Sequence, residues 1–407
     1  MSFILRDARI VDGLGDIQAR GFIVIEKNQI VEVGKGAGPS KKTGHDLIDL
    51  DGRCVLPGMI DCHVHLCIDG SADPMQPLQK DSPAMITLKA AKHASLTLLA
   101  GVTTVRDLGS ANGISGSLRD AITFGIVAGP RVVTTNQAVC ITGGQGWQFS
   151  RQADGPDDVR RAVREQIRAG ADAIKMMATG GVITPGVEPG SPQFTLEELK
   201  AGAEEAHKAG RKIAAHAQGN EGIKNSLRAG FDTIEHGIYL DDEAIALLLE
   251  KKAVLVPTLS APFNIMEKGE KSGIPSFIIE KTAKVKDAHV ASIKKAHKAG
   301  ITIASGADSG TPFNLHGENL KELELLVGIG LSPMEAIVSA TRIAAETLGL
   351  GSRLGTIEPG KLADLIVVEG DPLKDITVLQ QKDKMVAVMK DGSLLISDDY
   401  AGAIYRV

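Results

Sequence analysis

The feature that most constrains the fold is a strand-then-helix pattern that repeats eight times between residues 57 and 355. Several of the helical segments end in Ala-Gly, as at residues 100–101 and 299–300, where glycine accepts the left-handed backbone that follows a helix. Such alternation demands parallel strands joined by crossover helices, and eight units predict an α/β fold with a closed (β/α)8 barrel, a TIM barrel. The expected strands are residues 58–65, 103–108, 131–136, 173–178, 212–217, 233–237, 254–259 and 301–307.

The segments on either side of this region show strand patterns without helical periodicity. Asp12-Gly13 and Asp391-Gly392 mark turns between the strands. The simplest arrangement pairs the two ends of the chain with each other. We therefore predict a small discontinuous β-sandwich domain, residues 1–56 with 356–407, into which the barrel domain 57–355 is inserted. The expected strands are residues 3–10, 21–26, 29–33, 47–50, 364–369, 384–390 and 393–396.

Composition limits the kinds of partner. The 407 residues carry a net charge of −5 and contain 43% hydrophobic residues, so nothing indicates a nucleic acid or an anionic membrane surface. The N-terminus lacks the pattern of a signal peptide, and no charge-free apolar run reaches membrane-spanning length. Four cysteines without a CxxC pair indicate reduced, mostly buried thiols. We expect a cytoplasmic homo-oligomer that acts on a small molecule and has no nucleic-acid or membrane partner.

The first expected barrel strand ends in two histidines, His63 and His65. Residues i and i+2 of a strand point to the same face, so the two imidazoles can bind one metal ion. Two histidines on one strand are also common as ordinary surface or core residues, and this pair taken alone favours that ordinary interpretation.

Four more residues with suitable side chains fall at the ends of other expected strands, which is where catalytic groups of such barrels lie. Taken singly, His216 and His236 would more often be core histidines, and Asp308 a helix cap. Lys175 lies in an apolar strand, where an unpaired ammonium is costly, so it is modified, faces a charged partner or extends to solvent. Because all of them share the strand-end position, we predict a single site. The remaining histidines are expected at the surface, among them His93, His207, His289 and His297.

This set resembles the amidohydrolase superfamily, whose binuclear branch carries His-x-His on strand 1, Lys on strand 4, His on strands 5 and 6, and Asp on strand 8. The phrase Leu-Pro-Gly-Met-Ile-Asp-Cys-His-Val-His at residues 56–65 is similar to the strand-1 phrase of that family. Gly-Thr-Ile-Glu-Pro-Gly-Lys-Leu-Ala-Asp-Leu at 355–365 is similar to its C-terminal phrase. The resemblance covers most of the chain, and the family's discontinuous β-sandwich matches both ends.

The resemblance implies a role for each residue. Lys175 would be carbamylated by CO2 and would bridge two divalent metal ions. Zn²⁺ suits the donors best, with Mn²⁺, Co²⁺ or Ni²⁺ as alternatives. A metal-bridging hydroxide would be the nucleophile, and Asp308 would take its proton and pass it to the leaving amine. The implied ligands besides Lys175 are His63, His65 and Asp308 for one ion and His216 and His236 for the other.

The substrate class is also implied by resemblance. Residues 170–175 and the Gly-Gly pair at 180–181 are similar to a branch of metal-dependent dipeptidases that remove C-terminal Pro, Arg or Lys and are related to imidazolonepropionases. Tyr239 matches a tyrosine that helps that branch to bind the substrate's oxyanion or carboxylate, although an ordinary loop aromatic is the alternative. Gln145 stands where the branch commonly has histidine. Glutamine can donate a hydrogen bond but cannot be protonated, so the exact substrate stays open.

Two further residues are candidate substrate contacts. Trp147, the only tryptophan, lies in a glycine-rich loop and would either wall the pocket or belong to the core. Arg106 ends the second barrel strand and would bind a substrate carboxylate or pair with Asp107 or another structural acid.

The leading hypothesis is a binuclear metal-dependent amidohydrolase that cleaves the amide bond of a dipeptide or an N-acyl amino acid, as an Xaa-Pro or Xaa-Arg/Lys dipeptidase does. The alternatives are hydrolysis of a cyclic amide, as in imidazolonepropionase, or of a carboxylic or phosphoric ester. A deaminase is disfavoured because the mononuclear deaminase branch does not use the strand-4 lysine. A non-catalytic scaffold is disfavoured because all six ligand positions are filled.

Overall fold

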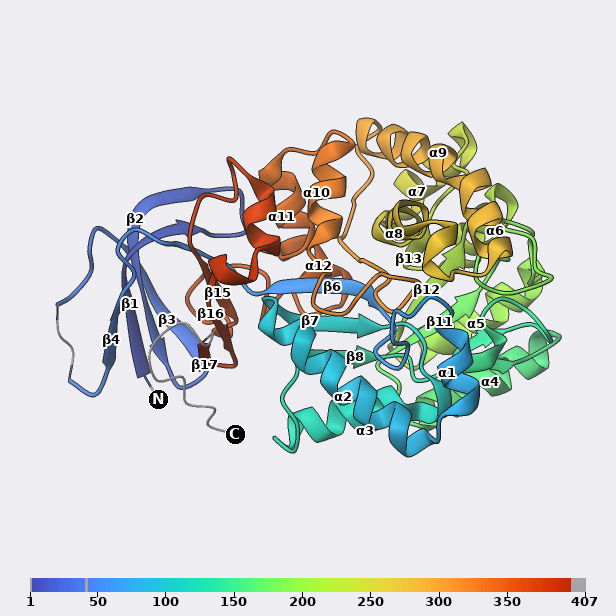
Figure 1. The fold of residues 1–407 in the computed structure, drawn as a ribbon, viewed down its shortest axis with the longest axis horizontal. Coiled ribbons are helices and arrows are strands. Elements are labelled where there is room, and N and C mark those ends of the chain that lie inside the picture. Colours follow the sequence, from blue (N-terminus) through green and yellow to red (C-terminus); the bar gives the residue numbers. More distant parts are fainter. Residues whose placement is uncertain (1, 41–42, 397–407) are drawn as a thin grey trace.

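The two ends of the chain meet in one mixed sheet, drawn in blue and red on the left of Figure 1. The computed structural model describes residues 2–40 and 43–396, so the expected β domain is described except for residues 1, 41–42 and 397–407. The strand order is β17-β16-β15-β5-β1-β2-β3, with β4 beside β1. These strands are β1 (Ser2–Val11), β2 (Ile17–Glu26), β3 (Gln29–Lys35), β4 (Asp46–Asp49), β5 (Cys54–Pro57), β15 (Leu365–Val368), β16 (Met385–Lys390) and β17 (Ser393–Ile396).

Strand β15 joins this sheet to the rest of the molecule. It pairs antiparallel with β5, with Leu365 opposite Pro57, so segments about 300 residues apart in the chain are neighbours. Its side chains alternate between two faces: Leu365 and Val367 pack into the core of the β lobe, whereas Ile366 and Val368 pack into the main core. Because both faces are buried, the strand is apolar throughout.

The remaining strands are parallel and form two sheets. One contains β6 (Met59–Val64), β7 (Val102–Asp107) and β8 (Arg131–Thr134). The other contains β9 (Ala138–Cys140), β10 (Ser150–Gln152), β11 (Ala173–Met177), β12 (Lys212–Ala217), β13 (Thr233–His236) and β14 (Val254–Val256). The segment expected as the eighth strand forms single bridges in place of a continuous strand. It contacts β14 through a parallel bridge between Ile303 and Leu255 and β6 through a bond from the Cys62 N–H to the Ser305 carbonyl.

Helices cover the outside of these parallel strands (Figure 1). Their ends follow the local sequence: Thr195 and Glu198 form a capping box before α5, and Gly101 follows α2 with φ 89°. The helices are α1 (Met75–Lys80), α2 (Pro83–Leu99), α3 (Ile114–Thr123), α4 (Pro156–Arg168), α5 (Leu196–Lys208), α6 (Asn220–Ala229), α7 (Asp242–Lys251), α8 (Ser260–Lys268), α9 (Ser276–Lys298), α10 (Lys321–Gly328), α11 (Pro333–Ser339) and α12 (Arg342–Thr347). Within the described residues, no helix has the length and apolar character needed to cross a membrane.

Candidate metal centre

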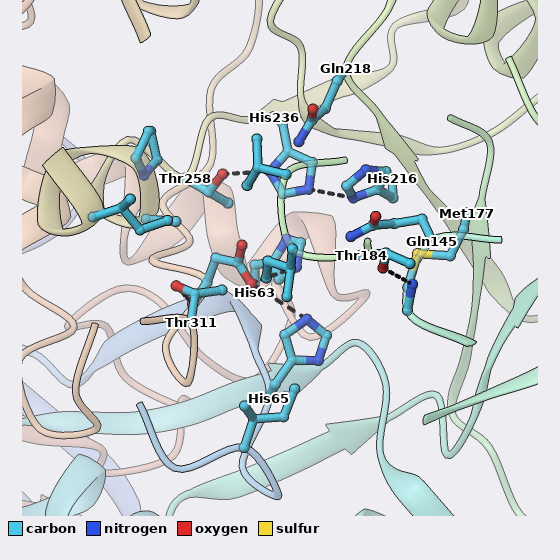
Figure 2. A pocket seen from close by; sticks show the side chains of 18 of the residues that line it. His63, His65, Gln145, Met177, Thr184, His216, Gln218, His236, Thr258 and Thr311 are labelled. Carbon is cyan, nitrogen blue, oxygen red and sulfur yellow. Dashed lines mark hydrogen bonds and ion pairs between the residues drawn. The ribbon is translucent and has the colours of Figure 1, made fainter. Parts of the chain in front are cut away.

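Six side chains from five segments of the chain converge at one end of the parallel sheets, and Figure 2 shows the four histidines among them facing one another. Each side chain is brought there by the end of its own strand or by the loop that follows, as the alternation predicts. All six residues are more than nine-tenths buried. They are His63 and His65 at the end of β6, Lys175 in β11, His216 in β12, His236 at the end of β13 and Asp308 after the bridging segment.

The donor atoms form two neighbouring groups. In the first, Nε2 of His63 and Nε2 of His65 each lie 3.4 Å from Oδ1 of Asp308, and the three ligand atoms lie within 4.8 Å of one another. In the second, Nε2 of His236 lies 2.9 Å from Nδ1 of His216. The rings of His63 and His236, one from each group, are 5.2 Å apart between centroids. The first group therefore meets the requirements of a cation site, and the second group lies directly beside it.

Outer hydrogen bonds orient all four imidazoles, and the longest of them joins Nε2 of His216 to the Gly180 carbonyl at 3.4 Å. Nδ1 of His63 lies 2.8 Å from Oε2 of Glu235, Nδ1 of His65 lies 3.0 Å from the Gly109 carbonyl, and Nδ1 of His236 lies 2.6 Å from the Thr258 hydroxyl. A partner on the outer nitrogen fixes the ring and directs the other nitrogen inward, as for metal-binding histidines in general. Burial lowers the pKa of His65 to about 4, which keeps the lone pair on its inner nitrogen available to bind a metal ion.

Lys175 is the residue that the rest of the centre leaves without a partner. Its side chain is 1% exposed, and Nζ has no hydrogen-bond partner among the described residues. Burial lowers the pKa of this amine, because a buried ammonium loses its hydration. The centre thus combines neutral imidazoles, a carboxylate and an unpartnered amine. This set of donors fits divalent cations such as Zn²⁺.

Two of the six residues adopt an uncommon backbone conformation. His236 has φ 71° and Asp308 has φ 58°, which is the left-handed region that non-glycine residues rarely enter. The Asp308 N–H donates to the His63 carbonyl at 2.7 Å, so neighbouring segments hold this conformation in place. Outliers of this kind cluster at functional sites, and here they direct two side chains into the centre.

The centre lies on the wall of a cavity whose other lining residues are uncharged. Gln145, Gln218 and three threonines supply polar groups. His289 also contacts the cavity, and burial lowers its pKa to about 4, so it is neutral at neutral pH. The apolar lining includes Ile68, Met75, Phe149, Met177, Val182, Ile183, Ile238, Ile265 and Val285.

The residues predicted to contact substrate lie in three different environments. Gln145 lines the cavity and is 5% exposed; its Oε1 accepts from the Gly181 N–H at 3.1 Å. Trp147 and Tyr239 are 41% and 37% exposed, and their chain neighbours Gly146 and Ile238 line the cavity. Neither Trp147 nor Tyr239 is itself among the residues that line the cavity.

Arg106 belongs to the core of the α/β lobe and not to the cavity. It is 1% exposed, and its guanidinium donates to Oε1 of Glu235 at 2.8 Å, to the Cys62 carbonyl at 2.7 Å and to the Thr233 hydroxyl at 3.2 Å. Of the two interpretations of Arg106, this burial favours pairing with a structural acid over binding a substrate carboxylate, because its side chain is enclosed and already paired. Its acidic partner is Glu235, not Asp107.

Sequence reasoning missed some residues and misplaced others. Glu235 was missed, although an acid in an apolar strand raises the same question of burial as Lys175 does. His93 and His289 were expected at the surface but are 9% and 1% exposed. His93 of α2 bonds to the Leu66 carbonyl, next in the chain to His65. His289 of α9 bonds to the carbonyl of His236 itself. Both helices therefore turn a histidine inward toward the centre.

Comparisons with known proteins agree with this geometry. The model of the family described as "Amidohydrolase family" matches residues 54–395. Ochratoxinase from Aspergillus niger is 32% identical over 416 aligned residues, which cover 95% of this chain and 85% of the relative. Imidazolonepropionase from Fusobacterium nucleatum subsp. nucleatum is 25% identical, with 88% of this chain and 87% of the relative covered. A crystal structure of a Xaa-Pro dipeptidase with bound methionine in the active site has a TM-score of 0.90 at 36% identity and covers 98% of this chain and 100% of its own.

The family match includes all six residues of the centre, and the structural match extends over the β lobe as well. The family match and the relatives that share nearly the whole length lead to one conclusion: this chain belongs to the amidohydrolase family and is a hydrolase that acts on amide bonds.

Proposed function

We propose that this protein hydrolyses the amide bond of a small N-acyl amino acid or dipeptide, with two divalent cations, Zn²⁺ by preference, in a closed (β/α)8 barrel. The observation that carries the proposal is the unpartnered Nζ of Lys175 amid five further donors. A CO2-derived carbamate on this nitrogen would replace a buried ammonium with an anion suited to binding cations. The residues that would hold the cations are His63, His65, Lys175, His216, His236 and Asp308.

Bound cations of this kind supply Lewis-acid polarisation of a carbonyl group and a lowered pKa of water. The protein's own part begins with Asp308. Its carboxylate lies beside the inner nitrogens of His63 and His65 and lines the cavity. We assign it the proton transfer of the reaction: it accepts a proton from the attacking water and donates it to the leaving nitrogen.

Gln145 is the proposed donor to the scissile carbonyl. Because Oε1 of Gln145 accepts from the Gly181 N–H, its Nε2 is directed toward the centre (Figure 2). A fixed N–H donor aimed at developing negative charge stabilises a transition state without reorganisation. A carboxamide does this independently of pH, unlike the histidine common at this position in the dipeptidase branch.

The margin and walls of the cavity select the substrate. Tyr239 has a hydroxyl that can donate to a substrate oxyanion or carboxylate, and Trp147 provides an apolar surface on the loop after β9. The apolar lining of the cavity suits a side chain without charge. A relative named Xaa-Pro dipeptidase supports amide cleavage at a small substrate. Assembly into a homo-oligomer and a cytoplasmic location remain predictions.

The test is hydrolysis by metal-loaded enzyme of a panel of N-acyl amino acids, dipeptides, cyclic amides, lactones and phosphotriesters, compared by kcat/KM. The proposal expects linear amides of amino acids to be the best substrates. If cyclic amides or esters exceed them by a factor of about 10² or more, which corresponds to about 2.7 kcal/mol, the proposed substrate class is refuted.

A further inference from the structure

Gln218 lines the cavity, but its side chain is not part of the candidate metal centre. It directly follows β12, two residues after His216. Its backbone is fixed from both sides: its N–H donates to the Thr179 hydroxyl at 2.9 Å, and its carbonyl accepts from the Tyr239 N–H at 3.0 Å. The side chain is 5% exposed, and Figure 2 shows its carboxamide near His236 with Nε2 toward the centre.

The carboxamide of Gln218 lacks partners within the described part of the chain. Its Oε1 is buried without a hydrogen bond. Gln145 differs, because its Oε1 is held by the Gly181 N–H. A buried polar group without a partner is unfavourable. The unpartnered oxygen leaves the carboxamide unengaged, and its Nε2, which faces the centre, can donate to a bound molecule.

Most of the other polar groups of the lining outside the centre have a hydrogen-bond partner. Nε2 of His289 lies 3.0 Å from the His236 carbonyl, while its Nδ1 is buried without a partner among the described residues. The three threonine hydroxyls bond to Gly146 N–H, to His236 Nδ1 and to the Asp308 carbonyl, and they belong to Thr184, Thr258 and Thr311 respectively. Apart from the six centre residues, this lining carries no charged side chain.

A lining of this composition disfavours a charged acyl group in the substrate. An α-ammonium group in the cavity would lose its hydration without gaining a carboxylate of its own, since Asp308 belongs to the centre. A neutral acyl group loses little on entering an apolar lining. Gln218 can meet a neutral polar atom of such a group with a hydrogen bond, but it cannot neutralise a cation.

We propose that the cavity selects substrates whose acyl group is uncharged, and that Gln218 is the specificity-determining residue that sets this preference. The inference rests on the amide hydrolysis proposed above and decides between its two substrate classes: N-acyl amino acids are favoured over dipeptides with a free α-amino group. A carboxylate at position 218 would supply the negative charge that the cavity lacks.

The test uses three amides of the same amino acid that differ at one position of the acyl group: propionyl (CH3), glycolyl (OH) and glycyl (NH3⁺). Assays at pH 6.5 keep the glycyl amine charged, because an α-amino group has a pKa of about 8. For the wild type, the propionyl and glycolyl amides should exceed the glycyl amide in kcat/KM by at least about tenfold. Equal kcat/KM for the glycyl and propionyl amides would overturn the inference while leaving amide hydrolysis intact. No cleavage of any member by metal-loaded enzyme would overturn the proposed function itself.

Two variants test whether Gln218 sets the preference for an uncharged acyl group. Gln218→Glu should raise the ratio of glycyl to propionyl kcat/KM by at least about tenfold, and Gln218→Leu should remove the advantage of glycolyl over propionyl. Gln29→Glu, which adds the same charge on exposed β3, is the control and should leave the ratios unchanged. Metal content is measured on each variant. A folded, metal-loaded Gln218→Leu enzyme with wild-type ratios of kcat/KM would refute the role of Gln218. This outcome can be read even if Gln218→Glu does not fold.

Discussion

Replacing Glu235 with glutamine should weaken both the fold and the metal centre, through two different contacts. Glu235 is fully buried. One carboxylate oxygen lies 2.8 Å from Nη2 of Arg106 and 2.5 Å from the Thr233 hydroxyl, and the other lies 2.8 Å from Nδ1 of His63. Glutamine keeps the size of the side chain but leaves the enclosed guanidinium of Arg106 without its counter-ion.

The magnitudes follow from the burial of both partners. Removing one member of a buried ion pair costs about 3–5 kcal/mol, mostly because the other charge stays buried and uncompensated. Removing a carboxylate behind a metal-binding histidine lowers metal affinity by about 10–100-fold. We therefore expect Glu235→Gln to lose about 3–5 kcal/mol in the free energy of unfolding of the apoprotein, and to bind Zn²⁺ at least about tenfold more weakly.

A second substitution separates the two effects. In Arg106→Met/Glu235→Gln both charges are gone, so most of the unfolding free energy should return, while Zn²⁺ affinity stays low because His63 still lacks its carboxylate. The surface pair of Arg151 and Asp158, with N–O distances of 2.7 and 2.8 Å, is the matched control: Asp158→Asn should cost less than about 1 kcal/mol. The assays are urea unfolding of the apoproteins and Zn²⁺ titration against a competing chelator. A Glu235→Gln protein with wild-type stability and wild-type affinity would refute this reasoning.

The remaining predictions concern the centre and one loop. Lys175→Ala should lose metal and activity together, and a short-chain carboxylate such as acetate should partly restore both; a variant that keeps both would make the lysine structural. Asp308→Asn should lower kcat by about 10² or more, measured at the wild-type optimum, whereas a near-normal kcat would assign the proton transfer elsewhere. Lys281→Met removes the bonds from Nζ to the Thr184 and Val187 carbonyls, which hold the loop before α5 against α9, so KM should rise by at least about threefold with metal content unchanged. An unchanged KM would show that this loop keeps its position without the lysine.

Residues that lie at strand ends could be predicted from sequence because their placement follows from two local rules. Side chains alternate along a strand, and the C-terminal ends of parallel strands meet at one edge. The rules place His216 and His236 together without any knowledge of how the helix between them packs. They also locate the parallel α/β core, since the expected strand at 212–217 coincides with β12.

Contacts across the molecule could not be predicted in the same way. Alternation places Arg106 on one face of its strand, but it does not say that Glu235, 129 positions later in the chain, lies opposite. Helical periodicity did not reveal the burial of His289, because the partner of His289 is the carbonyl of a strand-end residue. The break between α11 and α12 lies at Thr341, whose dihedrals, φ −128° and ψ −94°, are non-helical. Each of these features depends on which distant segments pack together.

The measurement that tests the central claim most directly is the metal content of protein purified without chelators. Elemental analysis should find about two equivalents of divalent metal per chain, and removal of the metal should abolish amide hydrolysis until Zn²⁺ is restored. Wild-type protein with close to no bound metal and undiminished amide hydrolysis would contradict the account.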